Sequence, residues 1–268
     1  MAHEGAVRLP TTLKAAYRTE LFRAFHSPYE TPIVVLINGV LMGVLWWWTP
    51  ADSLFSVHSL WAFPLVLASW MYSDVPATNV FGSDAKRMIA AFDDVPAMRR
   101  MLYAKNLVLM TLVVPIATTV AIVVAIYLHR PIVAFVNIGW IIVVPVSVLG
   151  VSAWFGIYFP YHPIEIKTRW EHRKPFFHMI VRWLAAAMVP YGLVPLLGAI
   201  VMIPTIILWN QAGVDPNKSE SDLLYFLGVA IACVLAVVLW WWGHKMAVKL
   251  ALRRRDKLVA YLSDPMNG

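Results

Sequence analysis

The chain has 268 residues, of which 60% are hydrophobic and 14% are charged, and its formal net charge is +7. A single cysteine, Cys233, excludes an intrachain disulfide and any metal site built from several cysteines. The positive residues border apolar stretches and do not form one basic face, so they indicate membrane orientation and no nucleic-acid partner is expected.

Six apolar stretches fill most of the chain and predict an all-α integral membrane protein. A helix needs about 20 mostly apolar residues to cross a hydrocarbon core of about 30 Å. The predicted spans are, in chain order, Thr31–Thr49, Ser59–Val80, Asn106–Leu128, Pro131–Phe159, His178–Ile200 and Leu223–Gly243. We expect one membrane domain over 1–268, with an interface helix in 1–30, six spans in 31–243 and a basic tail in 244–268.

Lys and Arg residues gather in alternate connections between these spans. On the opposite side only Arg130 and Lys218 are found. Cytoplasmic connections are the ones that collect Lys and Arg, so both termini are predicted to be cytoplasmic, in a cell inner membrane. The runs Trp46–Trp48 and Trp240–Trp242 close the first and last spans, as expected of anchors in the headgroup region of the bilayer.

The segment Leu13–Phe25 has apolar residues at helical spacing and basic residues largely elsewhere around the helix. It predicts an amphipathic helix that lies along the inner membrane surface before the first span. Within that span, Gly39 and Gly43 form a Gly-x-x-x-Gly pair, which permits close approach of two membrane helices. These glycines are therefore candidate dimer contacts.

The connection Phe81–Tyr103 is too charged to lie in lipid and too regular in pattern to be a slack loop. It contains a short apolar edge, and Asp84 precedes that edge as a candidate helix cap. The residues that form the edge are Met88, Ile89, Ala91 and Phe92. Asp93, Asp94 and Pro96 then interrupt the helix. The segment is either a helix that transmits force from a soluble partner or a solvated connector.

The order of motifs from Asn79 to Lys105 resembles the cytoplasmic connection of type-2 ATP-binding-cassette (ABC) exporter permeases. An Asn is followed by Phe-Gly, a charged helical turn, Val-Pro and then Arg-Arg-x-x-Tyr-x-Lys. The layout of a surface helix and six spans is similar to that of the same family. The stretch Gly150–Pro163, with small residues before an aromatic-Pro-Tyr turn, resembles the end of the fourth span in actinobacterial members.

This resemblance implies a coupling helix over Ser83–Arg100 that sits in a groove of a separate ATP-binding subunit. The residues implied in that contact are Ser83, Arg87, Met88, Phe92, Asp93, Arg99 and Arg100. The chain has no Gly-x-x-x-x-Gly-Lys-Ser/Thr loop for ATP phosphates. We therefore expect no catalytic residue, metal or cofactor in this chain, with ATP and Mg²⁺ bound by the partner ATPase and a second permease, identical or paired, beside it.

The apolar stretch His178–Trp209 would be about 48 Å long as one helix, which exceeds a single crossing. It contains Pro190, Pro195 and Pro204, each of which lacks an amide donor. We expect a span followed by a short re-entrant or surface helix near Val201–Trp209. A single long tilted helix is the alternative.

The family implies a substrate route between two permeases, lined by the first, second and fifth spans. Polar groups lie at the inner third of the second span, at Tyr72, Ser73, Asp74 and Asn79. A carboxylate there is costly unless it faces water, protein or a cation, so Asp74 either lines a cavity or has a structural role. Few buried charges favour an amphipathic drug, antibiotic or lipid-like substrate.

Two other function classes fit parts of the sequence. A secondary transporter or channel without an ATPase would normally need a clearer set of buried ion ligands. In an enzyme that modifies lipids, Asp93-Asp94 would hold Mg²⁺, with His162, His172 and His178 as bases or ligands. The acidic pair lacks a second carboxylate motif, and the histidines lack the i and i+4 spacing of a helical metal pair.

Overall fold

The computed structural model describes residues 7–26, 29–48, 60, 62–73, 75–160, 162, 177–212 and 223–264, and every element in these ranges is a helix. Five stretches of helix in them are long and apolar enough to cross a membrane. They belong to α2 (Glu30–Trp48), α6 (Val95–Tyr127), α7 (Pro131–Ser152, extended by α8), α10 (Phe177–Ala212) and α11 (Leu223–Arg253). The fold is therefore all-helical and compatible with a membrane protein, as the sequence predicts.

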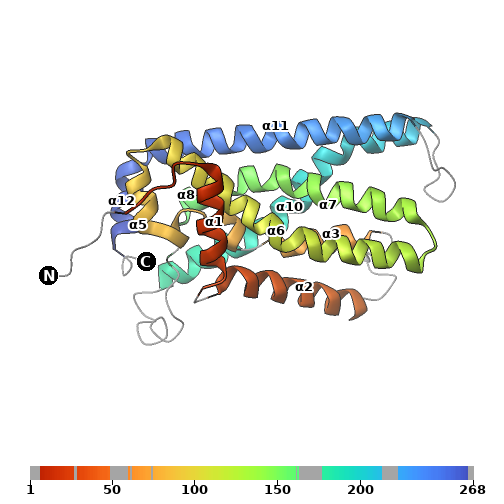
Figure 1. Ribbon diagram of the computed structural model, residues 1–268, viewed down its shortest axis with the longest axis horizontal. Coiled ribbons are helices and arrows are strands. Elements are labelled where there is room, and N and C mark those ends of the chain that lie inside the picture. The colour runs from red at the N-terminus through yellow and green to blue at the C-terminus, as the bar shows by residue number, and fades with distance from the viewer. Residues whose placement is uncertain are drawn as a thin grey trace.

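The second predicted span, Ser59–Val80, is not one continuous helix. Its described part consists of α3 (Phe63–Met71) and α4 (Val75–Thr78), and α3 with 9 residues extends only about 13 Å. The amide of Tyr72 still bonds to the Ala68 carbonyl at 3.0 Å, after which the helix stops. Figure 1 shows α3 behind α6 and alongside the long helices, so this part of the chain runs within the bundle without forming a sixth long helix.

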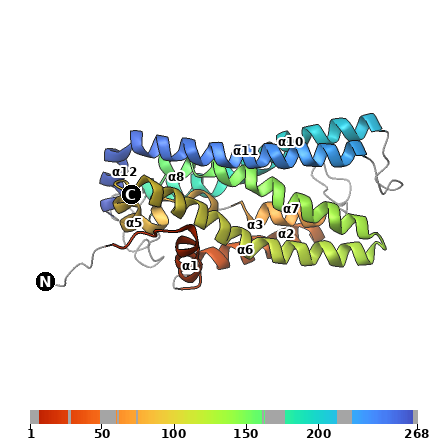
Figure 2. The same ribbon diagram turned by 45° about the horizontal axis from the view of Figure 1, so that its top comes forward.

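No separate outer helix follows the fifth predicted span, because α10 is continuous over 36 residues, about 54 Å. The expected break near Val201–Trp209 is absent, and the alternative of one long helix describes the structure. Packing explains this: Val201 and Thr205 are buried, and a Cβ atom on Gly228 of α11 would lie 2.7 Å from the Thr205 Cα atom. The outer part of α10 thus already has a partner in α11 and lies beside it in both views (Figures 1 and 2).

The shorter helices gather at one end of the bundle, which we call the α1 end (Figure 1). They are α1 (Leu13–Ala24), η1 (Gly82–Asp84), α5 (Ala85–Ala91), α8 (Phe155–Tyr158) and α12 (Arg255–Ser263). In both views α1 runs across the direction of the long helices (Figures 1 and 2). The first and last described residues lie at this same end (Figure 1).

Local sequence explains where the helices at the α1 end begin. Thr12 caps α1, since its hydroxyl accepts a hydrogen bond from the Ala15 amide at 3.1 Å. Asp94 caps α6 by accepting from the Ala97 amide at 2.9 Å, so the interruption predicted around Asp93–Pro96 is confirmed. The helix that contains the third predicted span therefore begins at Val95, and α6 includes the last part of the predicted connection.

Small residues let the long helices approach closely. A Cβ atom on Gly243 of α11 would lie 2.6 Å from the Gly150 carbonyl carbon of α7, so these two backbones are in contact. A Cβ atom on Gly156 of α8 would lie 2.3 Å from the Thr78 carbonyl oxygen at the end of α4. The small residues of the stretch 150–163 thus bring α7 against α11 and α8 against the connection that follows α3.

Candidate functional site

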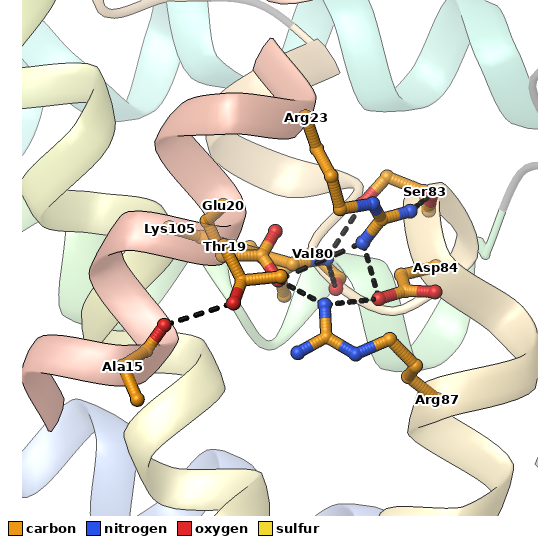
Figure 3. A network of polar contacts seen from close by, with 9 residues as sticks. All are labelled: Ala15, Thr19, Glu20, Arg23, Val80, Ser83, Asp84, Arg87 and Lys105. Carbon is orange, nitrogen blue, oxygen red and sulfur yellow. Dashed lines mark hydrogen bonds and ion pairs between the residues drawn. The ribbon is translucent and has the colours of Figure 1, made fainter. Parts of the chain in front are cut away.

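A network of charged side chains joins α1 to the connection between α4 and α6 (Figure 3). It consists of three cations and two carboxylates. They are Glu20 and Arg23 from α1, Asp84 from η1, Arg87 from α5 and Lys105 from α6. In their usual ionisation states these groups leave one positive charge in excess.

The guanidinium of Arg87 connects the two carboxylates. Its Nη1 atom lies 2.8 Å from Glu20 Oε1 and 3.0 Å from Asp84 Oδ2. The side chains of Glu20 and Asp84 are each only 8% exposed, and that of Arg87 is 14% exposed. Arg23 also forms an ion pair with Asp84. Carboxylates this buried need such partners, because removing an unpaired charge from water costs on the order of several kcal/mol.

Lys105 extends the network to α6. Its Nζ atom donates to the Val80 carbonyl and to the Ser83 hydroxyl, each at 2.6 Å. Arg23 donates to the Ser83 carbonyl at 3.4 Å, so both cations hold the same turn of chain. The consequence is mechanical: α1, the connection after α4 and the beginning of α6 are tied together by directional contacts.

Helix α12 packs against α5, which belongs to the connection between α4 and α6. Met88 and Phe92 are 0% and 3% exposed, and they lie in one apolar cluster with Leu258 and Leu262 of α12. At the rim of this cluster, Arg255 Nη2 lies 2.6 Å from Asp93 Oδ1. The tail of the chain is thus an integral part of the α1 end.

This packing corrects two of the predicted docking contacts. Met88 and Phe92 were expected to pack in a groove of another subunit, but the structure buries them inside the chain because α12 fills that position. Arg87 is likewise engaged with Glu20 and Asp84. Of the other predicted contacts, Asp93 and Arg99 are exposed.

The two remaining predicted contacts, Ser83 and Arg100, both form hydrogen bonds within the chain. Ser83 is exposed, but its hydroxyl accepts a hydrogen bond from Lys105. Arg100 Nε donates to the Pro10 carbonyl at 2.9 Å, so this side chain holds the N-terminal segment against α6. Asp93 and Arg99 are therefore, with Ser83, the predicted contacts that remain exposed, and Asp93 is also paired with Arg255.

Asp84 occupies the cap position of α5, as predicted, but makes no capping hydrogen bond. Its carboxylate binds Arg23 and Arg87 instead. Glu20 and Lys105 were not predicted as site residues. The sequence feature that could have indicated an ion pair is Glu20 itself. It is an acidic residue on an otherwise basic helix, three positions before Arg23.

The residues predicted to line a substrate route are enclosed within this chain. Tyr72, Ser73 and Asn79 are 1%, 2% and 2% exposed, and the Ser73 hydroxyl donates to the Ser69 carbonyl at 2.6 Å. Asp74 lies outside the described residues. Tyr72 belongs to an apolar cluster formed by α2, α3, α6 and α7, and the side chains of Ser73 and Asn79 are also covered by the described part of this chain.

The two glycines of the predicted dimer contact differ. A Cβ atom on Gly39 would lie 3.5 Å from the Met71 sulfur, so Gly39 faces α3 of its own chain. Among the described residues, nothing beyond its own stretch of helix lies within 4 Å of a Cβ atom placed on Gly43. Gly43 is therefore the member of the pair that could meet a neighbouring molecule.

Two buried histidines connect helices. His244 Nδ1 lies 2.8 Å from the Trp240 carbonyl, which can only accept, so Nδ1 carries the proton. Nε2 then accepts from the Asn106 amide at 2.9 Å and links α11 to α6. His162 Nε2 lies 3.0 Å from the Tyr261 carbonyl and donates to it, holding α12. Among the described residues, no three His, Cys, Asp or Glu side chains are grouped to hold a metal ion.

Comparisons with protein-family models, curated proteins and solved structures gave no match for this chain.

Proposed function

We propose that this chain is the transmembrane permease subunit of an ATP-driven ABC exporter of the type-2 class. A separate ATP-binding subunit would supply the energy, and a second permease, identical or paired, would complete the route. The substrate class is an amphipathic drug, antibiotic or lipid-like molecule. The observation that carries the proposal is the charged network that ties α1, the α4–α6 connection and α6 together (Figure 3).

Such a network suits a permease that has no ATPase site of its own. A subunit that binds at the α1 end can change the transport route only if its movement reaches the spans. Arg87 and Asp84 lie on the connection, Glu20 lies on the crosswise helix α1, and Lys105 lies on a long helix. A displacement of the connection would therefore shift α1 and α6 together and bias the protein between two arrangements.

The proposal includes six passes, with α3 and α4 as the described part of the second. It also places the α1 end in the cytoplasm. Support comes from the Lys and Arg residues gathered in this part of the chain and from the position of both ends of the described chain there (Figure 1). The long helices α6 and α11, about 50 Å and 46 Å, exceed the hydrocarbon thickness, so both would project beyond the membrane at this end.

The docking surface in this proposal centres on the exposed residue Arg99 and on Asp93 with its partner Arg255. It differs from the predicted coupling helix, because the apolar face of α5 is already covered by α12. We expect the ATP-binding subunit to contact α12 and the first turn of α6 together. Gly43 on the outward side of α2 is the candidate contact with the second permease.

The proposal is tested by isolating the tagged chain from its native membrane under gentle conditions and identifying bound proteins by mass spectrometry. We expect an ATP-binding subunit with the wild type, and its loss with Arg99→Glu. Arg130→Glu is the matched control, since it reverses an exposed charge in the turn between α6 and α7 at the other end of the bundle.

The outcomes separate the function from the docking surface. Recovery of the ATP-binding subunit with wild type and both variants would refute the docking surface and support the subunit assignment. Absence of any ATPase from the wild-type preparation, also after crosslinking, would refute the assignment and favour a secondary transporter.

A further inference from the structure

One face of α11 is exposed along most of the helix and changes character within a single turn. Its first part is apolar, and its last part is basic. The apolar members are Leu227, Ile231, Val234, Val238 and Trp241, and the basic members are Lys245, Lys249 and Arg253. Their spacing of three or four residues places them all on one side of the helix.

The opposite face of α11 packs against its own chain. Ala232 and Ala236 lie in a cluster with α7 and α10, and Ala247 and Ala251 lie in the cluster at the α1 end. Gly243 touches the α7 backbone. The exposed stripe therefore points away from the bundle, toward whatever surrounds the protein.

The three cations of the stripe have no carboxylate partner among the described residues. Lys245 Nζ lies 5.0 Å from the centre of the Trp241 ring, which leaves its charge uncompensated. Other cations at the α1 end are engaged differently. Arg87 binds two carboxylates, and Lys105 binds a carbonyl and a hydroxyl. The positive charge of α11 is thus available to an external anion.

The apolar part of the stripe is long enough to cover one leaflet of a bilayer. From Leu227 to Trp241 the helix rises about 21 Å, more than half of the 30 Å hydrocarbon core. Lys245 lies about 6 Å and Lys249 about 12 Å beyond Trp241 along the axis. The headgroup layer on each side is roughly 5 to 7 Å thick, so the Lys245 backbone falls at the level of lipid phosphates. The Lys249 backbone lies one helical turn further out, and its long side chain can extend back toward the phosphates.

We propose that this face of α11 is a binding site for an anionic phospholipid. An acyl chain would lie along Val234, Val238 and Trp241, and the phosphate would be held between Lys245 and Lys249, with Arg253 adding to the attraction. A lipid fits better than a soluble anion, because the cations continue an exposed apolar stripe that a free ion would leave uncovered. Lipid binding at this face of α11 does not depend on the transport function proposed above.

The site would also anchor the α1 end to the membrane. Helix α12 follows α11 after Arg254, whose guanidinium lies 3.3 Å from the Ile157 carbonyl. Since α12 packs on α5, a lipid held at Lys245 and Lys249 would set the height of both helices relative to the bilayer.

The test measures lipid binding to the purified full chain in detergent. Phosphatidylglycerol and phosphatidylcholine of the same acyl composition are titrated separately, with bound lipid counted by native mass spectrometry and stability followed by thermal unfolding. We expect preferential binding of phosphatidylglycerol and a larger rise in Tm with it. In Lys245→Gln/Lys249→Gln the phosphatidylglycerol affinity should fall on the order of fivefold for each neutralised residue, as for basic residues near anionic membranes.

Three controls make the result specific. Lys245→Arg/Lys249→Arg keeps the charge and should keep the binding. Arg99→Gln/Lys257→Gln removes two exposed cations from α6 and α12 and should leave the lipid preference unchanged. Inorganic phosphate alone should not raise Tm. Equal binding of the two lipids, or undiminished phosphatidylglycerol binding by the Gln variant, would overturn the proposal, and so would a Tm rise with inorganic phosphate equal to that with the lipid.

Discussion

The α1 end and the crossing of α7, α10 and α11 are held together by different means. At the α1 end, Glu20, Asp84 and Arg87 join separate helices through ion pairs. At the crossing, Gly150 meets Gly243 and Gly228 meets Thr205, with backbones in contact and no charged group involved. Both regions join segments that are far apart in the sequence.

The physical reason for the difference is the surroundings of each region. Between apolar helices in lipid there is little hydrophobic driving force, so association depends on close packing of small residues. At the α1 end, the connection between α4 and α6 consists of short helices and turns. Its backbone carbonyl groups are not all used within a helix, and long charged side chains can reach them. The stability of the α1 end therefore depends on specific pairs of charged side chains.

The largest effect is expected from neutralising a buried carboxylate of the network. Glu20→Gln removes one of the two carboxylates that compensate the positive charge of Arg87. This change should reduce the free energy of unfolding by about 3 kcal/mol. Equilibrium unfolding in mixed micelles measures this change. Asp93→Asn is the matched control, because Asp93 is 74% exposed and surface ion pairs contribute at most about 1 kcal/mol.

A double variant sharpens this test. Adding Arg87→Gln to Glu20→Gln should cost less than the sum of the two single changes, since the pair is coupled. Equal losses for Glu20→Gln and Asp93→Asn would show that the buried network contributes nothing special to the α1 end.

A smaller effect is expected at the helix crossing. Gly150→Ala places a methyl group 2.7 Å from the Trp240 Cα atom, which forces α7 and α11 apart and should lower the stability by about 1 to 3 kcal/mol. Gly139→Ala on the same helix meets no atom within 4 Å, so its stability should be unchanged or slightly higher. Thermal unfolding of the two variants in one detergent compares them, and equal Tm values would refute the close contact.

The smallest effect concerns a polar contact between two apolar helices, α10 and α2. The Tyr191 hydroxyl of α10 donates to Asn38 Oδ1 of α2 at 2.7 Å. Tyr191→Phe removes this bond and should cost about 0.6 kcal/mol, the average for hydrogen bonds between membrane helices. Mixed-micelle unfolding detects it, with Tyr158→Phe, at an exposed ring, as control. A loss of 3 kcal/mol or more would mean that a polar contact between apolar helices contributes as much to stability as the buried ion pairs at the α1 end.

Periodicity and length predicted the membrane class, the long helices and the break at Asp93–Pro96, because these depend on local composition and on capping. The same reasoning placed Met88 and Phe92 on an outer face, since the apolar edge of a short charged helix gives no sign of which neighbour covers it. The neighbour is α12, a segment more than 150 residues later in the chain.

Local composition is sufficient to predict an all-helical chain suited to a bilayer, because hydropathy is a sum over neighbouring residues. The short length of α3, the unbroken course of α10 and the pairing of Glu20 with Arg87 are seen only in the folded chain. The last two depend on distant partners: α11 lies beside α10, and α1 folds across α5 and α6. Such contacts depend on three-dimensional packing, which no local pattern of residues records.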